Sequence, residues 1–445
     1  MKKRRKSWIS STLQAPVLVV IPFFIVSGFF TIEAGVSLYG SDLFRLGADL
    51  SPPGAHLLLA GLGRTDEELE RREAPRISEE AVTEQKGGSD ELPEPLRLLT
   101  RGWNTNWSTR TIEFNELQHG GPPRDGIPSI DNPTFVSVEV ASTWLAPNEP
   151  VIFTQIEDDT RAYPLQILIW HEIVNDRVGG IPVLVTFCPL CNASILYNRR
   201  LEGKEFEFGT SGLLRNSDLV MYDRSTESLW QQLTGEAIVG DLAGKRLDII
   251  PSSIASFGDF SNQYPKGEVL SRETGYQRRY GENPYTGYES IDQNPFLFKG
   301  ELDHRLKPME RVVAVSLITA EGKSIDVAYP FRLLSQKEVI NDSVEGIDLV
   351  VFYTPGTSSA LSSSSISEGT DVGASGVYSP QQKGEKLIFV KKGDNIQDIQ
   401  SGSRWNIFGL AIEGSLEGVK LTPIPHGDFF WFAWAAFKPD TIIYR

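Results

Sequence analysis

The chain has 445 residues, of which 40% are hydrophobic and 23% are charged, and this composition is typical of a globular protein. At about 150 residues per domain, its length suggests two or three domains. The formal net charge of -15 argues against a nucleic-acid-binding surface, because such surfaces gather positive charge. The two cysteines are too few for a framework of disulfides.

The amino terminus has the pattern of a membrane anchor. Residues 2–6 are all basic, and residues 7–32 contain no charged side chain. A helix needs about 20 apolar residues to cross a bilayer, and its positively charged flank stays in the cytoplasm. We therefore expect residues 1–35 to form a cytoplasmic tip and a single transmembrane helix, with the bulk of the chain periplasmic or extracellular. A cleaved signal peptide is the alternative.

Residues 36–100 predict an acidic tether between the membrane and the folded part of the chain. Glutamate side chains crowd the second half of this segment, and large apolar side chains are sparse there. Such a segment cannot bury enough apolar surface to offset the entropy lost on ordering, so we expect it to be partly disordered.

The remainder of the sequence contains an internal duplication. Residues 161–195 match residues 327–361 at a constant offset of 166 residues, with Ala-Tyr-Pro near the start of each segment and Asn-Asp in the middle. Repeat arrays need at least three units of shorter period, so this pattern does not predict a solenoid. We expect two tandem related domains, residues 101–300 and residues 301–445.

Each copy is expected to be mainly β with a minor α component. Residues 181–187 and 347–353 are apolar, β-branched runs that are typical of buried strands. Residues 165–174 and 332–340 are the best helical candidates. The Asn-Asp pair that closes each of these segments predicts a C-terminal helix turn, because Asn tolerates the left-handed conformation.

Cys188 and Cys191 directly follow the first of these strands and lie three positions apart at a predicted turn. This spacing lets both sulfurs face one point, which suits a soft metal ion, a redox-active dithiol or a static disulfide. The second copy keeps the surrounding scaffold but has Thr354 and Thr357 at these positions. The fold therefore forms without the thiols, and we infer that the pair serves a function beyond packing.

Three further side chains are candidate ligands of the same ion, expected to be copper or zinc. His171 is replaced by Lys337 in the second copy, so it changes together with the cysteines. Met221 carries a thioether suited to Cu(I), and His426 would face the cysteines if the copies packed about a pseudo-two-fold axis. The polar turn at residues 210–218 could line a pocket beside the cysteines.

The run W-H-E-I-V-N-D, followed by T-F-C-P-L-C-N and by M-Y-D-R-S-T-E-S-L-W-Q-Q-L-T-G-E-A-I-V-G, resembles the signature of a family of exported bacterial and archaeal proteins built on a domain of unknown function. The resemblance covers roughly residues 135–445. It implies an extracytoplasmic location and assigns no catalytic residue.

Three functions follow from the sequence, and whether the protein is an enzyme stays open. The leading hypothesis is metal binding at Cys188 and Cys191 by a membrane-anchored, extracytoplasmic protein. The second is a thiol-disulfide oxidoreductase that uses the same pair and exchanges electrons with a redox partner protein. The third is a non-catalytic scaffold in which the pair forms a static disulfide. No nucleic-acid partner is expected.

Overall fold

The computed structural model describes residues 92–445. These residues belong to one compact unit, Ala74–Arg445. The predicted membrane anchor and most of the predicted tether lie outside the described residues. Among the helices of residues 92–445, none combines the length and the apolar character needed to cross a bilayer.

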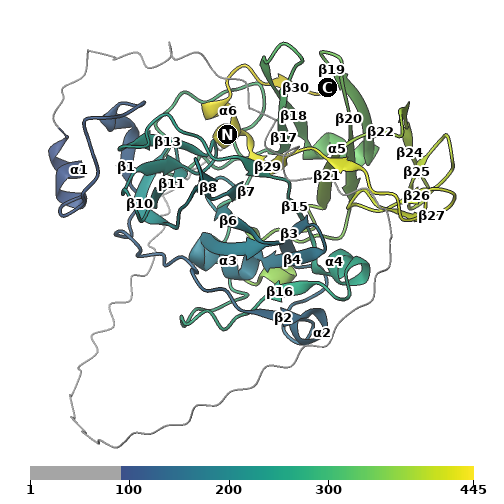
Figure 1. The fold of residues 1–445 in the computed structure, drawn as a ribbon, viewed down its shortest axis with the longest axis horizontal. Helices are drawn as coiled ribbons and strands as arrows, with labels where there is room; N and C mark the ends of the chain where they lie inside the picture. The colour runs from purple at the N-terminus through teal and green to yellow at the C-terminus, as the bar shows by residue number, and fades with distance from the viewer. Residues whose placement is uncertain (1–91) are drawn as a thin grey trace, which may run out of the picture. The chain divides into compact units, whose positions relative to one another are not determined.

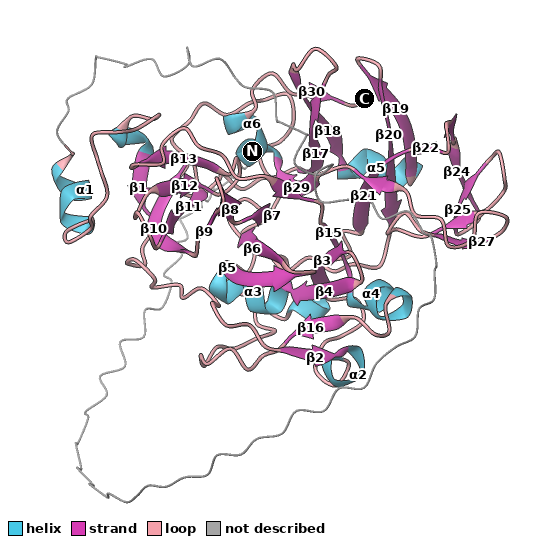
Figure 2. Cartoon of the chain, in the orientation of Figure 1, coloured by secondary structure: helices cyan, strands magenta, loops and turns pink. Residues whose placement is uncertain are grey.

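The described part of the chain is mainly β, as predicted, and its first half forms three sheets and a short ribbon (Figure 2). One sheet has the order β1 (Leu117–His119), β10 (Phe208–Arg215), β11 (Asp218–Asp223), β12 (Leu229–Gln231), β13 (Glu236–Val239). The next has the order β14 (Ile249–Ile250), β7 (Ala193–Asn198), β6 (Ile181–Cys188), β5 (Ile173–Val178). The third has the order β15 (Ser253–Ser256), β3 (Pro150–Ile156), β4 (Asp159–Pro164), β16 (Glu268–Leu270), β2 (Phe135–Ser137), and the ribbon pairs β8 (Arg200–Leu201) with β9 (Lys204–Glu205).

The second half forms three four-stranded sheets and another ribbon. Their orders are β29 (His426–Phe430), β17 (Arg311–Ile318), β18 (Ser324–Pro330), β30 (Ile442–Ile443); β19 (Val339–Val344), β20 (Ile347–Thr354), β21 (Ala374–Ser379), β28 (Thr422–Pro423); and β24 (Phe389–Lys392), β25 (Asn395–Asp398), β26 (Arg404–Trp405), β27 (Ala411–Glu413). The ribbon pairs β22 (Gln381–Gln382) with β23 (Glu385–Lys386). The α-helices are α1 (Glu94–Leu99), α2 (Val138–Ala141), α3 (Leu165–His171), α4 (Phe257–Gln263), α5 (Phe331–Lys337) and α6 (Trp431–Phe437), and the 3-10 helices are η3 (Phe114–Glu116) and η4 (Ile366–Glu368).

The strand order of the first half recurs in the second half. The run β15-β3-β4-β16 corresponds to β29-β17-β18-β30, and in both runs the last pair is parallel and the others are antiparallel. The run β14-β7-β6-β5 corresponds to β28-β21-β20-β19, and β10 to β13 correspond to β24 to β27. We call β3–β16 the first repeat, β17–β30 the second repeat, and residues 271–310 the connecting segment.

Residues shared by the two repeats make the same hydrogen bonds in each. Asn175 accepts from the backbone N–H of Phe208 and donates to the carbonyl oxygen of that residue, and Asn341 forms the same two bonds with Phe389. The matched residues therefore hold the fold together. Two further pairs of hydrogen bonds match in the same way: Tyr163 to Asp176 with Tyr329 to Asp342, and Trp230 to Asp223 with Trp405 to Asp398.

The predicted helices end earlier than the sequence suggested. Helix α3 ends at His171, because Glu172 adopts a left-handed backbone with φ of 59°, and Glu338 does the same after α5 with φ of 56°. The residues after each turn pair as strands β5 and β19. The prediction of a helix turn at Asn175 was therefore wrong, since the β-branched residues that precede it favour a strand.

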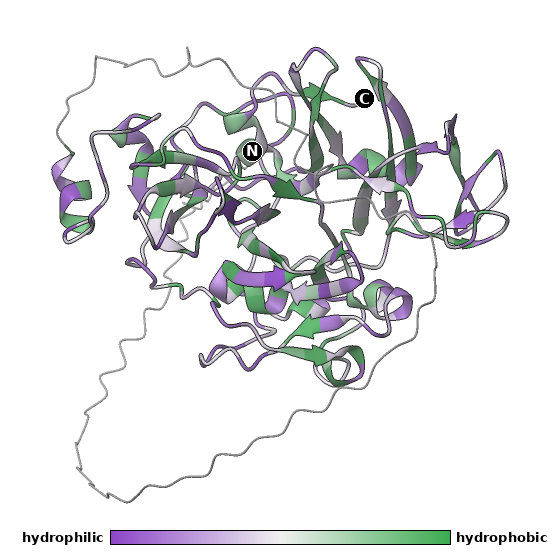
Figure 3. Cartoon of the chain, in the orientation of Figure 1, coloured by the Kyte–Doolittle hydropathy of each residue, from purple (hydrophilic) through white to green (hydrophobic). Residues whose placement is uncertain are grey.

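The two repeats are joined through their cores. Strand β29 of the second repeat lies beside β7 of the first, near the centre of the view in Figure 1. The backbone N–H of Phe430 donates to the carbonyl of Cys191 at 2.9 Å. One hydrophobic cluster includes residues of β6, β7 and β17 from the two repeats together with residues of α6. Hydrophobic residues, drawn in green in Figure 3, recur along the strands.

Candidate metal site

The two cysteines lie at the ends of a tight turn between β6 and β7. Cys188 ends β6 and pairs with Ala193, the first residue of β7. The backbone N–H of Cys191 donates to the carbonyl of Cys188 at 3.2 Å, and Asn192 adopts a left-handed φ of 49°. Proline presets the backbone angle that such a turn needs, and Asn tolerates the left-handed region. The run C-P-L-C-N therefore encodes the turn that brings both thiols together.

Asp218 reaches the cysteines from the hairpin formed by β10 and β11. Asn216 and Ser217 link these strands with φ of 49° and 68°, and positive φ at both positions is typical of a type I′ turn. The Oδ2 atom of Asp218 accepts from the backbone N–H of Leu233 at 3.0 Å and from the side-chain amide of Gln231. The Oδ1 atom is buried and accepts from no N–H or O–H group within residues 92–445, and the thiols of Cys191 and Cys188 are hydrogen-bond partners of this carboxylate.

Cys188, Cys191 and Asp218 form a compact set of potential ligands. Their ligand atoms all lie within 4.8 Å of one another. The exposed fractions of the three residues are 2%, 0% and 0%. Thiols are weak hydrogen-bond donors, so a cation would be a stronger partner for the buried carboxylate of Asp218. Two thiolates and a carboxylate are a donor set that zinc accepts.

The surroundings of the two thiols favour their protonated form. Burial raises the pKa of Cys188 and of Cys191, and the negative charge of Asp218 raises both further. Burial also raises the pKa of Asp218 to about 6. Catalytic and redox-active cysteines have a lowered pKa, because the thiolate is the reactive form. These thiols need a bound cation to lose their protons near neutral pH.

A second buried carboxyl group, that of Glu172, lies beside this set. The carbonyl of Glu172 accepts the backbone N–H of Phe187 at 2.8 Å, which places Glu172 next to Cys188 across the β5–β6 pair. Glu172 is 7% exposed. Burial raises its pKa to about 8, and the negative charge of Asp218 contributes.

The connecting segment and the second repeat enclose the site. Tyr285 and Tyr288 pack against the hydrophobic cluster that contains both cysteines. The ring of Tyr288 lies 6.2 Å from that of Phe430, which is hydrogen-bonded to Cys191. Burial raises the pKa of both phenols, and negative charge at Glu172 and at the cysteines contributes. The thiols are therefore covered from several sides.

The second repeat lacks all three ligands. Thr354 and Thr357 replace the cysteines, and each of their hydroxyls is buried without a partner within residues 92–445. The hairpin of β10 and β11 pairs residues 208–223, whereas its counterpart pairs only residues 389–398. Asp218 lies in the part of the hairpin that the second repeat does not have. The thiols and the carboxylate are thus present together in one repeat and absent together from the other.

His171, a predicted ligand, is bonded elsewhere. Its Nδ1 atom lies 2.7 Å from the carbonyl oxygen of Pro128, and its Nε2 atom lies 2.7 Å from the hydroxyl of Tyr280. A carbonyl only accepts, so Nδ1 carries the proton and Nε2 accepts from the tyrosine. Burial lowers the pKa of His171 to about 4, so the ring is neutral near pH 7. In this structure His171 joins α3 to the loops at Pro128 and Tyr280.

Replacing His171 with phenylalanine is expected to destabilise the protein and to leave its zinc affinity within about threefold of wild type. The change leaves the carbonyl of Pro128 without its partner and removes one of the two hydrogen bonds of the Tyr280 hydroxyl, which keeps Thr274, and the loss costs about 2 kcal/mol. In the wild type the folded-state pKa is lowered from 6.5 to about 4, so the ring contributes roughly 3 kcal/mol of stability above pH 6.5. That contribution is lost as the pH falls from 6.5 to 4.

Urea unfolding between pH 4 and pH 8 measures this contribution, and zinc titration of the same samples measures the affinity. Between pH 6.5 and pH 4 the free energy of unfolding should fall less in the variant than in the wild type, because the variant has no His171 to protonate. A loss of zinc affinity as large as that of a cysteine variant would show that His171 is a ligand after all.

The other two predicted ligands occupy different places. Met221 lies on β11 in the hydrophobic cluster that contains both cysteines, and its role as a ligand stays a prediction. His426 begins β29, where its Nδ1 atom lies 2.8 Å from the carbonyl oxygen of Ile424 and its Nε2 atom is buried without a partner within the described chain. The residue of β29 that reaches the cysteine turn is Phe430. Four residues of extended strand span about 13 Å, so His426 lies well away from that turn.

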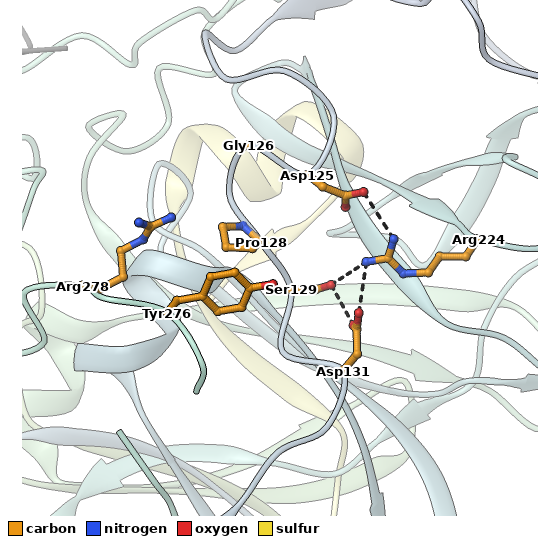
Figure 4. A pocket seen from close by; sticks show the side chains of 8 residues that line it. All are labelled: Asp125, Gly126, Pro128, Ser129, Asp131, Arg224, Tyr276 and Arg278. Carbon is orange, nitrogen blue, oxygen red and sulfur yellow. Dashed lines mark hydrogen bonds and ion pairs between the residues drawn. The ribbon is translucent and has the colours of Figure 1, made fainter. Parts of the chain in front are cut away.

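A surface pocket of about 450 Å³ is lined by other residues than the three ligands (Figure 4). Two of its lining residues, Pro128 and Tyr276, contact His171. Arg224 crosses it and bonds to Asp125 at 3.3 Å, to Asp131 at 3.2 Å and to the hydroxyl of Ser129 at 2.9 Å. The guanidinium therefore offsets one of the two negative charges, and Arg278, which also lines the pocket, carries a second positive charge. The residues that line the pocket are Asp125, Gly126, Pro128, Ser129, Asp131, Arg224, Tyr276 and Arg278.

Two residues of the candidate site were missed by sequence reasoning. Asp218 ends the polar turn that was expected to line a pocket beside the cysteines, but it was not singled out as a ligand. Glu172 was hidden because the second repeat keeps a glutamate at the same position, Glu338. The signal that could have revealed Asp218 was the absence of its whole turn from the second copy.

The comparisons with known proteins give one match. Residues 124–441 match the model of the family described as "Protein of unknown function (DUF3179)", a range that contains the cysteine turn, the first repeat and the second repeat up to its last strand, β30. No curated protein and no solved structure gave a significant match. Because the matched range covers more than half of the sequence, the chain belongs to the DUF3179 family.

Proposed function

We propose that this protein binds one zinc ion through Cys188, Cys191 and Asp218. The observation that carries the proposal is the position of the buried Asp218 carboxylate beside two thiols, in a set whose ligand atoms lie within 4.8 Å of one another. A cation bonds to this carboxylate and favours loss of both thiol protons. The second repeat lacks both thiols and the carboxylate, and this joint absence supports the view that the three groups form one site.

The donor set favours zinc over copper. Cu(I) prefers thiolate and thioether ligands, whereas zinc takes Cys, His and carboxylate ligands together. The carboxylate of Asp218 suits zinc, and a copper site would depend on Met221. Zinc is also the ion for which three protein ligands and a fourth, non-protein ligand are a common arrangement.

A thiol-disulfide oxidoreductase is the second candidate, supported by the C-x-x-C spacing and by two cysteines that are not joined to each other. Burial of both thiols and their raised pKa count against it, because a redox-active cysteine needs an accessible thiolate. A static disulfide is the third candidate.

We further propose that the site lies outside the cytoplasm, in a chain anchored by its amino-terminal apolar segment. The basic residues 2–6 and the uncharged residues 7–32 support this orientation. Protease added to intact cells, or to cells whose outer membrane has been opened, should cleave the carboxyl-terminal part of the protein. Protection of that part until the inner membrane is broken would contradict the orientation.

Metal titration tests the proposed site. The full chain is purified under reducing conditions, stripped of metal and titrated with Zn²⁺ against a chromogenic chelator. We expect one zinc ion per chain, and Asp218→Asn should lower the affinity at least about tenfold because a ligand oxygen is lost. Failure of the wild type to bind zinc or copper would refute the proposal. A reversible disulfide with a potential above about -300 mV would then favour the oxidoreductase.

A further inference from the structure

The surface pocket drawn in Figure 4 is formed by three segments that are distant in the sequence. Asp125 and Asp131 precede the first repeat, and Arg224 directly follows strand β11 of that repeat. Tyr276 and Arg278 belong to the connecting segment. The volume of about 450 Å³ falls within the range of small-molecule sites, about 300–1,000 Å³. None of the three proposed zinc ligands lines the pocket, so its ligand is a question separate from the metal.

One side of the pocket carries an uncompensated negative charge. Arg224 donates to Asp125 at 3.3 Å and to Asp131 at 3.2 Å, so two carboxylates share one guanidinium. Tyr222 donates to Asp125 at 2.6 Å and Asn175 donates to Asp131 at 2.7 Å, and these bonds hold both carboxylates in place. The side chains of Asp125 and Asp131 are 34% and 32% exposed, so a molecule in the pocket can reach them. We call these two carboxylates, with Arg224, the acidic side.

Arg278 brings an uncompensated positive charge to the same pocket. It is exposed and forms no ion pair within residues 92–445, and its side chain has one hydrogen bond there, 3.4 Å long, to the carbonyl of Gln277. The next residue, Arg279, pairs with Glu282. Figure 4 draws Arg278 and Arg224 on opposite sides of Tyr276. The guanidinium of Arg278 is therefore available to bind a carboxylate, with which arginine forms paired hydrogen bonds.

Tyr276 gives the pocket an aromatic wall. Its ring lies 5.5 Å from the ring of His171, and the residue is 44% exposed. Such a ring packs against the alkyl part of a ligand, and its face attracts an ammonium group. A ligand of this pocket thus finds a negative group, a positive group and an apolar surface.

The second repeat has no counterpart of the acidic side. Asp223 and Asp398 occupy equivalent positions, because each accepts a hydrogen bond from a tryptophan of the following strand. The next residue is Arg224 in the first repeat and Ile399 in the second, and Ile399 is 58% exposed. The repeat therefore folds without an arginine here, which favours a role for Arg224 in the pocket.

We propose that this pocket binds a small zwitterion, with its carboxylate at Arg278 and its ammonium group on the acidic side. A simple anion would meet the negative charge of Asp125 and Asp131, and a simple cation would meet the positive charge of Arg278. A molecule with both charges complements both groups, and such complementarity sets specificity. The chemical class is that of free amino acids, whose alkyl part would lie against Tyr276.

Calorimetric titration of the full chain with a series of amino acids tests the inference. Glycine, β-alanine, γ-aminobutyrate, δ-aminovalerate and ε-aminocaproate differ in the separation of their two charges. We expect one length to bind most tightly. It should bind at least about tenfold more tightly than the alkanoate and the alkylamine of the same length, each of which keeps only one of the charges.

The connecting segment supplies a matched pair of arginine variants. Arg278→Met removes the charge at similar size and should weaken binding of the best amino acid at least about tenfold. Arg278→Glu should make the alkylamine a tighter ligand than the amino acid, because the pocket then carries only uncompensated negative charge. Arg279→Met changes the neighbouring arginine, which does not line the pocket, and should stay within about twofold of wild type. Thermal unfolding confirms that each variant is folded.

Four outcomes would overturn the inference. The first is the absence of binding by every member of the series up to about 10 mM, a concentration that detects weak binding by so few atoms. The second is an alkanoate that binds as tightly as the amino acid, since the acidic side would then play no part. The third is an alkylamine that does so, since Arg278 would then play none. The fourth is wild-type affinity in Arg278→Met.

Discussion

Replacing either Cys188 or Cys191 with serine is expected to lower the zinc affinity of the full chain about 100-fold or more, close to 2.7 kcal/mol of binding free energy. A serine hydroxyl does not ionise in this pH range, so the variant loses one anionic ligand and leaves the ion with two. Competition with a chelator of known affinity, under reducing conditions, measures the change.

The second repeat supplies the matched control. Thr354→Ser and Thr357→Ser change the corresponding positions of the same fold, and both should leave zinc affinity unchanged. Each cysteine variant should also be less stabilised by added zinc, because a ligand that binds only the folded state raises stability by RT ln(1 + [L]/Kd), or about 4 kcal/mol at 1,000 times Kd. Equal zinc affinity in wild type and both cysteine variants would rule out this site.

The zinc affinity of the wild type is expected to fall steeply as the pH is lowered. Burial raises the pKa of both thiols above their usual range, so both are protonated in the metal-free protein near pH 7. Binding must release both protons, and the affinity should therefore drop ~100-fold for each pH unit between pH 8 and pH 6.5. Below about pH 6 the drop becomes steeper, because Asp218 also becomes protonated.

Calorimetric titrations in buffers of different ionisation enthalpy count the released protons directly. About two protons per zinc ion are expected at pH 7.5 in the wild type, and about one in Cys188→Ser. A count near zero in the wild type would mean that the thiols are already ionised. The site would then resemble a reactive cysteine pair more than a buried metal centre.

Much of the fold was accessible from the sequence because its strands are encoded locally. The runs at 181–187 and 347–353 are apolar and β-branched, and both are strands in the structure. The ends of the helices were harder to place. Glu172 and Glu338 give no sequence signal for a left-handed backbone, since Asn and Gly are the usual residues at such turns. The Asn-Asp pairs looked like helix ends, but their side chains hold neighbouring strands in place.

The candidate site was only partly accessible, because it depends on contacts between distant segments. The C-x-x-C turn is a local motif and was found. Asp218 lies in a hairpin that approaches this turn, and no sequence pattern predicts which turn a hairpin will approach. His171 varied between the copies together with the cysteines, yet it makes its own hydrogen bonds beside them. Covariation in a single pair of repeats does not separate a ligand from a residue that supports a nearby loop.

The hydrogen bond from Phe430 to Cys191 has a consequence for the order in which the molecule is assembled. Ribosomes deliver the amino end first, so the thiols and Asp218 emerge long before strand β29 and the tyrosines that later cover them. A newly made chain thus passes through a stage in which the thiols and Asp218 have been synthesised and the segments that cover them have not. An ion captured at that stage would be enclosed by segments that are synthesised later, and replacing it afterwards would require those segments to move away.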